Sequence, residues 1–266
     1  MNVRTWKALA VAVAMAGCGG ESTVGIDAGP DAGEAADAGG SDTGVDAGVD
    51  AGVDGGLDAG EDAAVDGGID AGPSTTTEVS LDFEGELPSF VTTACEGTPS
   101  QGYAPLGPEG HQFGPTFLRC LTGSTITITL TDLPEHTSLD LDFLFAAIDS
   151  LDGEGSFPAG DFFRVDLDGT TIFREAFANA TPSQIQTYDP PVPEIVLARR
   201  VDLGFSGPGG FYTDSAYDMS LDPVFDGLPH TASTATFVFT LEGEGVQSLD
   251  DESWAIDEVR VLLNRD

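Results

Sequence analysis

Two acidic segments of the chain follow the same order of residues. Leu-Pro-Glu-His-Thr at 133–137 precedes an alternating apolar stretch and then Asp-Ser-Leu-Asp-Gly-Glu at 149–154, while Leu-Pro-His-Thr at 228–231 precedes another and then Gln-Ser-Leu-Asp-Asp-Glu at 247–252. If the two stretches run side by side as strands, their ends bring two carboxylate-rich loops to one edge. Converging oxygens suit Ca²⁺, which takes about six to eight oxygen ligands and tolerates irregular geometry. We therefore predict a structural calcium site there; the alternative is that acids crowd every loop of so acidic a chain. The predicted ligands are Asp149, Asp152, Asp251 and Glu252.

The other reactive side chains give no catalytic pattern. His136 and His230 each follow a proline at the entry to a predicted strand, where a hydrogen-bonded cap is expected rather than a metal ligand. His111 has no second ligand at the spacing of a zinc site. The segment 204–208 reads Gly-Phe-Ser-Gly-Pro and misses a nucleophile elbow because its last position is proline. Paired carboxylates for glycoside hydrolysis are too numerous to be informative. The sequence therefore predicts that the protein is not an enzyme.

Three aromatic residues near acidic segments are candidates for ligand binding. Tyr212 and Tyr217 lie in a segment rich in Gly, Pro, Ser and Asp, and Trp254 follows the acidic residues at 250–252. Aromatic rings with neighbouring carboxylates can stack on a sugar and hydrogen-bond to it. The alternative is that these rings fill the open ends of the fold.

The elements that must position these residues are strands. Apolar residues recur with period two, which is typical of half-buried antiparallel strands. The stretches are 126–130, 139–145, 163–167, 201–205, 237–241 and 259–263. Turn signals such as Leu-Pro, Asp-Gly and Gly-Pro-Gly-Gly separate them, and no long helical pattern is present. We predict an all-β domain over 74–266, an antiparallel β-sandwich of jelly-roll type.

Both ends of this domain resemble known families. Leu-Asp-Phe-Glu at 81–84 and Trp-Ala-Ile-Asp-Glu-Val at 254–259 resemble the two ends of MAM domains and of jelly-roll carbohydrate-binding modules. In those families the first and last strands lie side by side, and acids from both ends commonly hold a structural calcium. The resemblance implies Glu84 and Asp257 as ligands, with Asp82 a further candidate.

The middle of the chain is similar to a secreted module found in bacteria and protists. It shares Leu-Pro-x-His at 133–136, an Asp-Gly hairpin at 168–169 and Asp-Glu-Ser-Trp at 251–254. Ile-Asp-Ser-Leu-Asp-Gly at 148–153 matches a further landmark, except that Leu151 replaces a tryptophan. These motifs identify a fold better than an activity.

Charge limits the partners of the chain. Its formal net charge is −37 at pH 7, and from residue 74 onward 32 acids stand against 7 arginines with no lysine. Nucleic acids and anionic lipid surfaces select positive charge and are excluded as natural partners. Cations, neutral ligands and basic partners are favoured.

Residues 1–17 have the order of an export signal. Arg4 and Lys7 precede an uncharged run that is too short to span a bilayer. Met-Ala-Gly-Cys at 15–18 resembles the lipobox of bacterial lipoproteins, although leucine is usual at the first position. This resemblance implies acyl chains on Cys18, a lipid anchor in the bacterial envelope, and a place at the outer membrane or cell surface. The alternative is an ordinary cleaved signal with a chance cysteine.

Residues 18–73 read as the lipidated cysteine followed by a linker. From residue 45 to 72 the chain consists of seven tetrads of the type Val-Asp-Ala-Gly, which cannot bury enough surface to offset the entropy of ordering. Such a coil spans roughly 40 Å. The calcium-binding β-helix repeat is excluded because its period is nine and this period is four.

Cysteine count predicts one disulfide. Lipidation of Cys18 leaves Cys95 and Cys120, which we expect to pair after export and to stabilise the fold by about 3 kcal/mol. A cysteine nucleophile is the alternative, but it lacks a neighbouring base.

Together these features predict a lipid-anchored envelope or surface protein with a calcium-stabilised module that recognises carbohydrate or another extracellular ligand. The alternative is a structural or adhesive envelope protein that binds a protein partner, and a glycan-active hydrolase is the third choice.

Overall fold

The computed structural model describes residues 74–155, 160–205, 212–243 and 247–265. The export signal, Cys18 and the linker lie outside these residues. The described helical segments are four 3₁₀ turns: η1 (Gln101–Tyr103), η2 (Pro193–Ile195), η3 (Met219–Leu221) and η4 (Pro223–Phe225). Within the described ranges, no helix is long and apolar enough to cross a membrane.

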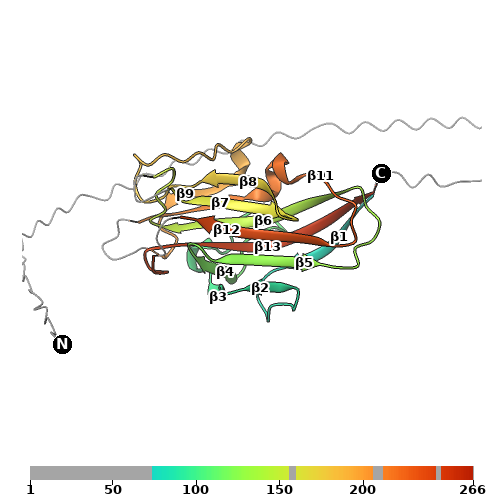
Figure 1. Ribbon diagram of the computed structural model, residues 1–266. Coiled ribbons are helices and arrows are strands. Elements are labelled where there is room, and N and C mark those ends of the chain that lie inside the picture. Colours follow the sequence, from blue (N-terminus) through green and yellow to red (C-terminus); the bar gives the residue numbers. More distant parts are fainter. Residues whose placement is uncertain (1–73, 156–159, 206–211, 244–246, 266) are drawn as a thin grey trace, which may run out of the picture. The chain divides into compact units, whose positions relative to one another are not determined.

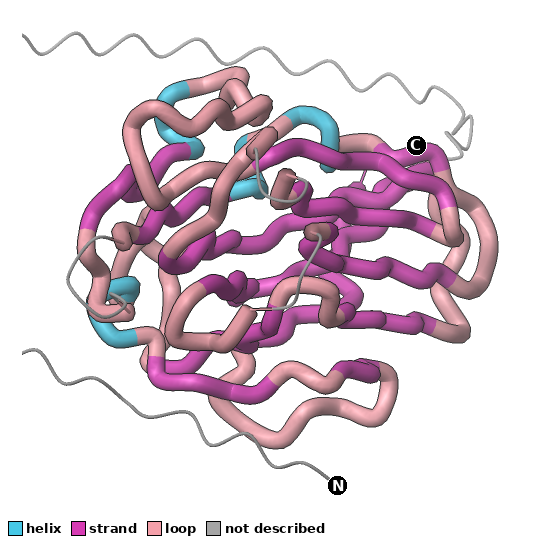
Figure 2. Tube along the Cα trace, turned by 60° about the vertical axis from the view of Figure 1, so that its left-hand side comes forward, coloured by secondary structure: helices cyan, strands magenta, loops and turns pink. Residues whose placement is uncertain are grey.

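In the described residues, thirteen strands form two antiparallel sheets that face each other (Figures 1 and 2). The first sheet has the order β3 (Glu96–Pro99), β4 (Thr116–Leu121), β13 (Glu252–Arg265), β6 (Ser138–Asp149), β10 (Asp214–Asp218), β9 (Val196–Val201), with β1 (Ser74–Leu81) on β13 and β11 (Leu228–Pro229) on β6. The second has the order β2 (Val91–Thr93), β5 (Thr125–Leu130), β12 (Ala235–Glu242), β7 (Phe162–Leu167), β8 (Thr170–Ala176).

The topology is that of a jelly roll. The four central strands of the first sheet are β4, β13, β6 and β10, and they face β5, β12, β7 and β8 of the second. The chain crosses repeatedly between the sheets, so that strands distant in sequence become neighbours. This confirms the predicted all-β jelly-roll sandwich.

Alternation along β6 shows why the sequence adopts this fold. Leu139, Leu141 and Phe143 point into the sandwich and are fully buried, whereas Asp140 and Asp142 are half-buried on the outer face. Beyond Phe143 every residue of β6 is buried because a second apolar cluster covers the outer face. That cluster includes Tyr103, Phe113, Phe117, Leu144, Ala146, Ile148, Phe205, Ala216 and Ala255.

One strand prediction is wrong in position. The period-two pattern at 201–205 lies mostly outside a strand, since β9 ends at Val201. Leu203 instead donates its backbone N–H to the Asp214 carboxylate at 2.8 Å, so this segment is hydrogen-bonded to a side chain and not to a neighbouring strand.

The strands of the two similar segments lie in different sheets. β6 belongs to the first sheet and β12 to the second, and the rings of Phe143 and Phe239 meet across the core with centroids 5.3 Å apart. Their ends still converge, because the loop after β12 leads into β13 and Glu252 of β13 pairs with Asp149 of β6.

The first and last strands lie side by side, as the family resemblance implied. β1 pairs antiparallel with β13 from Ser74 opposite Arg265 to Leu81 opposite Val259. The 14 residues of β13 span about 45 Å. Ser74 therefore lies at the end of the sandwich opposite Glu252 (Figure 1).

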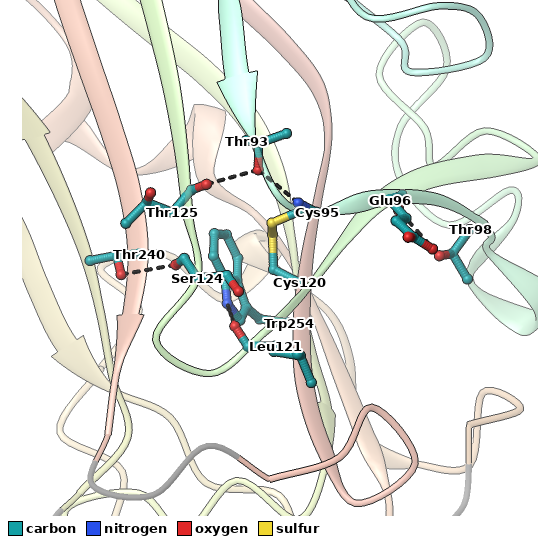
Figure 3. Close-up of a disulfide and its surroundings, with 10 residues drawn as sticks. All are labelled: Thr93, Cys95, Glu96, Thr98, Cys120, Leu121, Ser124, Thr125, Thr240 and Trp254. Atoms are coloured by element: carbon teal, nitrogen blue, oxygen red, sulfur yellow. Dashed lines mark hydrogen bonds between the residues drawn. A yellow bond between two sulfur atoms is a disulfide. The ribbon is translucent and has the colours of Figure 1, made fainter.

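The disulfide between Cys95 and Cys120 is confirmed (Figure 3). It joins the segment after β2 to β4, and both cysteines are buried. Trp254 lies beside it on β13 and donates its indole N–H to the carbonyl of Leu121 at 3.0 Å. The disulfide thus ties the chain between β2 and β3 to β4.

Candidate functional site at the acidic end of the sandwich

Six carboxyl groups gather where β6 ends and where β7, β10 and β13 begin; we call this place the acidic end. Asp149 closes β6, Asp214 opens β10 and Glu252 opens β13. Asp152, Asp161 and Asp251 lie in the adjoining loops. The structure thus brings together the four acids that the repeated segments pointed to and adds two more.

Asp149 lies at the buried centre of this end. Its backbone N–H donates to Asp214 Oδ1 at 3.1 Å, and the Arg119 Nη2 lies 3.5 Å from its Oδ2. Burial raises the pKa of Asp149 to about 8, the nearby Asp214 charge adds to the shift, and Arg119 opposes it. The carboxyl is therefore mainly protonated at neutral pH. Its Oδ1 has no hydrogen-bond partner.

Arg119 holds the loop that precedes β13. Its Nε donates to Ser253 Oγ at 2.9 Å, its Nη2 donates to the carbonyl of Leu249 at 2.5 Å, and its guanidinium lies 4.1 Å above the centre of the Phe205 ring. Burial lowers the pKa of Arg119 and Asp149 partly restores it. These contacts occupy the guanidinium, so it is not free to bind a ligand.

Asp161 and Glu252 share a proton. Their carboxyl groups are hydrogen-bonded to each other, while Asp161 Oδ2 accepts the backbone N–H of Asp152 at 2.6 Å and Glu252 Oε2 accepts from the Gln247 amide. Burial and then the bond to Asp161 raise the pKa of Glu252 to about 9. Two carboxyl groups in contact cannot both ionise, so one proton stays between them.

The outer part of the acidic end is formed by Asp152, Asp251 and Tyr212. All three are partly exposed. Asp251 fastens the two loops together, since its carbonyl accepts from the N–H and hydroxyl of Ser150 at 2.9 and 2.7 Å. The negative charge of Asp251, together with burial and a hydrogen bond to Asp251, raises the pKa of Tyr212, and Asp152 adds to the shift. The phenol therefore donates to Asp251 and stays neutral.

A groove of about 530 Å³ opens beside Asp152. Its lining combines two carboxylates, one amide, one hydroxyl and one apolar side chain that is 64% exposed, Ile185. Gln184 donates its amide to Asp152 Oδ1, which fixes the orientation of both groups. The lining residues are Asp152, Glu154, Gly155, Ser183, Gln184 and Ile185.

The donor geometry does not fit calcium at either predicted place. In the described part of the chain no three carboxylate, imidazole or thiol groups form a set that could hold a metal ion. At the acidic end Arg119 already faces Asp149.

The terminal pair is likewise occupied by backbone groups. Asp257 accepts the N–H of Gly114 at 2.9 Å and that of Glu258 at 2.8 Å, and Glu84 Oε1 accepts the N–H of Thr116 at 2.8 Å. Burial chiefly raises the pKa of Asp257 to about 7, with small additions from Glu258 and Glu84. Asp82 accepts the N–H of Glu84 at 3.2 Å and caps the turn. Calcium stays a sequence-based prediction that this geometry does not support.

Two of the three aromatic residues that were predicted to bind a ligand lie in the core. Trp254 and Tyr217 are fully buried, so neither ring is accessible for stacking. Tyr217 packs against Phe145 and Phe177, with ring centroids at 6.1 and 5.0 Å. The predicted binding role of both residues is wrong because each lies on a central strand whose inner face forms the core.

Sequence reasoning missed Arg119, Asp161 and Asp214. Arg119 is a single charge inside the apolar run Phe117–Leu121, which is the signal that could have revealed a buried ion pair. The two aspartates stand at the starts of β7 and β10, where the sequence shows only one acid among many.

No protein-family model matches the chain, and no curated protein matches it. The catalytic domain of a GH87 α-1,3-glucanase is similar in structure over 72% of this chain and 28% of that chain, with 17% identity and a TM-score of 0.29. Dimeric latent PorU from Porphyromonas gingivalis gives 12% identity and a TM-score of 0.33 over 72% and 14% of the two chains. The enzymatically active domain of tailspike protein 4 of bacteriophage CBA120 gives 13% and 0.24 over 65% and 19%. The chain thus spans less than a third of each of these proteins.

These similarities correct one expectation. The sequence predicted that the protein is not an enzyme, whereas the similar structures include glycoside hydrolase and tailspike domains with catalytic activity. That prediction is withdrawn. At such TM-scores and identities the similarity assigns no reaction to this chain.

Proposed function

We propose that the protein binds carbohydrate at the acidic end. The observation that carries this proposal is the groove at the acidic end, in which Gln184 donates its amide to Asp152, together with the partly exposed ring of Tyr212, whose pKa is raised by the charges of Asp251 and Asp152. An aromatic face next to oriented amide and carboxylate groups is the combination that stacks on a sugar ring and hydrogen-bonds its hydroxyls.

The charge of this end selects among carbohydrates. Asp152, Glu154 and Asp251 face solvent there, whereas Arg119 is buried and contacts Asp149. A uronic or sulfated sugar would be repelled by the surface carboxylates. Neutral and amine-bearing sugars are therefore the expected ligands.

The test is a glycan-array screen with the full chain, followed by calorimetric titration of the best-bound oligosaccharide. Tyr212→Ala should raise Kd about tenfold, which corresponds to about 1.4 kcal/mol, and Asp152→Ala should weaken binding by a similar factor. Glu78→Gln, an exposed acid on β1, is the matched control and should bind like the wild type. Equal affinities for all four proteins would place the site elsewhere.

Hydrolysis of the same carbohydrate is the second candidate. Burial raises the pKa of Asp152, and Asp251 adds to the shift, which favours a proton donor in the groove. Asp161 and Glu252 are in direct contact and thus closer than the about 5 to 9.5 Å that separates the carboxyl pair of most glycosidases. Release of reducing ends by the wild type, lost in Asp152→Asn with binding kept, would establish hydrolysis; binding without release would leave recognition.

We also propose that lipid on Cys18 anchors the protein in the bacterial envelope. The support is the lipobox-like sequence alone. Cys18→Ser should move the protein from the detergent phase to the aqueous phase in a detergent partition assay, and an unchanged partition would exclude the anchor.

A further inference from the structure

His136 and His230 meet at the end of the sandwich opposite the acidic end. His136 lies on the loop before β6 and His230 on the loop after β11, and both side chains are buried to more than nine-tenths. His136 Nε2 lies 2.7 Å from His230 Nδ1, and the ring planes are 13° apart. A contact this short between nitrogens means that the rings lie edge to edge along one N–H···N hydrogen bond rather than face to face.

The partners of the outer nitrogens fix the protons. His136 Nδ1 lies 2.6 Å from the carbonyl of Pro134, and a carbonyl only accepts, so this nitrogen carries a proton. His230 Nε2 lies 3.1 Å from both Asp168 Oδ2 and the carbonyl of Thr234, which also only accept, so it too carries a proton. The bond between the rings needs a third proton. Two neutral imidazoles supply only two, so the pair carries one positive charge.

The surroundings of the pair stabilise one charge. Asp168, in the turn between β7 and β8, faces His230 and also accepts the backbone N–H of Thr236 at 2.8 Å. Glu135 and Arg265 line the same pocket as His136, one with each sign of charge. Asp132 lies further along the loop of His136 and is exposed. One carboxylate therefore contacts the pair directly, which matches a single cation.

We propose that His136 and His230 form a pH-dependent latch between these two loops, closed only while one of the two rings is protonated. A second proton would set two N–H groups against each other at 2.7 Å, and loss of the shared proton would set two lone pairs against each other. In both cases one of the three hydrogen bonds along the pair is lost, and a second proton also drives the rings apart. The other direct links between the loops are the N–H of Leu133 to the carbonyl of Ser233 at 3.0 Å and the N–H of His230 to the carbonyl of Thr137 at 3.4 Å.

Opening the latch changes a pocket of about 510 Å³. His136 forms one wall of it, together with Thr137, Thr231, Glu135 and Arg265. Because the latch joins the two loops that carry this wall, its opening exposes the imidazoles to solvent and widens the pocket. The acidic end is not involved, since it lies at the other end of β6 and β13.

The test is NMR of the full chain labelled with ¹⁵N-histidine, from about pH 4 to about pH 9, on either side of the ordinary histidine pKa. We expect a ¹⁵N–¹⁵N coupling across the hydrogen bond between His136 Nε2 and His230 Nδ1 near neutral pH, and its loss toward acid. His111 lies elsewhere and serves as the internal reference. His136→Gln or His230→Gln assigns the resonances, and either variant is sufficient.

A second readout is amide exchange at Leu133. Its protection factor should fall at the acid limb in the wild type, and in His230→Gln it should be low at every pH. Absence of the ¹⁵N–¹⁵N coupling at every pH would overturn the proposal.

Discussion

Replacement of Arg119 by methionine tests whether the buried guanidinium holds the acidic end together. Methionine keeps an unbranched apolar side chain and removes the guanidinium that lies over Phe205, together with its charge and its donors. Ser253 Oγ and the carbonyl of Leu249 then lose their hydrogen bonds to Arg119 and keep only the hydrogen bond between them, at 3.5 Å. Arg119 is 7% exposed, so little water reaches the vacated positions.

The size of the effect follows from the state of Asp149. Breaking a buried ion pair costs about 3 to 5 kcal/mol when a charge is left behind. Asp149 has a pKa of about 8 beside Arg119, and loss of the guanidinium raises that pKa further, so the carboxyl stays protonated at pH 7. The expected cost is therefore that of the lost hydrogen bonds, about 3 kcal/mol. At about 2 to 4 °C per kcal/mol for a domain of this size, Tm falls by about 6 to 12 °C.

Urea unfolding at pH 7 and calorimetry measure this cost, and the chain offers a matched control. Arg174 contacts Glu242 at 2.7 Å and lies over the ring of Phe162, but its side chain is 46% exposed. Arg174→Met should cost less than about 1 kcal/mol, because exposed ion pairs contribute little. If Arg119→Met is no more destabilising than Arg174→Met, the buried guanidinium is not what holds this end.

Three further predictions concern the core and the shared proton. Glu252→Gln should fold and should flatten the pH dependence of Tm. The pKa of Glu252 is raised to about 9 in the folded protein, against about 4.3 in the unfolded chain, so wild-type stability falls as pH rises toward and through 9. In the variant the amide donates to Asp161 at every pH. The double variant Cys95→Ala/Cys120→Ala should lose about 3.5 kcal/mol in urea unfolding, since the bond closes a separation of 25 residues. Phe163→Ala should lose about 3 to 5 kcal/mol in the same assay because the ring is fully buried.

Each of these three predictions can be contradicted by its own measurement. An alkaline fall of Tm in Glu252→Gln as steep as in the wild type would show that the shared proton does not stabilise the fold. A double variant Cys95→Ala/Cys120→Ala as stable as the wild type would contradict the role of the disulfide. A cost below 1 kcal/mol for Phe163→Ala would contradict tight packing between the sheets.

Alternation of side chains was enough to predict the sandwich, because period two is a property of the strand itself. The spacing of Leu139, Leu141 and Phe143 predicts an inner face without knowledge of which strands lie beside them. The same logic failed at 201–205, where Leu203 bonds to an aspartate side chain that sequence periodicity does not reveal.

The candidate site was predictable only in outline. The repeated segments pointed to four acids that do meet, but the meeting depends on β12 leading into β13 and on β13 pairing with β6, not on two neighbouring strands. Which acids are buried, and which of them share a proton, depends on distances between loops. Arg119 illustrates the limit, since its partners come from β13, from the loop before it and from the end of β6.

The pairing of β1 with β13 has a mechanical consequence. If a load pulls on the chain from before Ser74 while a ligand is held at the acidic end, the force runs along both strands in opposite directions. The ladder from Ser74 to Leu81 is then sheared, so its hydrogen bonds resist together rather than opening one after another. The disulfide at Cys95 lies further along the chain. It limits the length of chain that the load can extend before strands of the first sheet must separate.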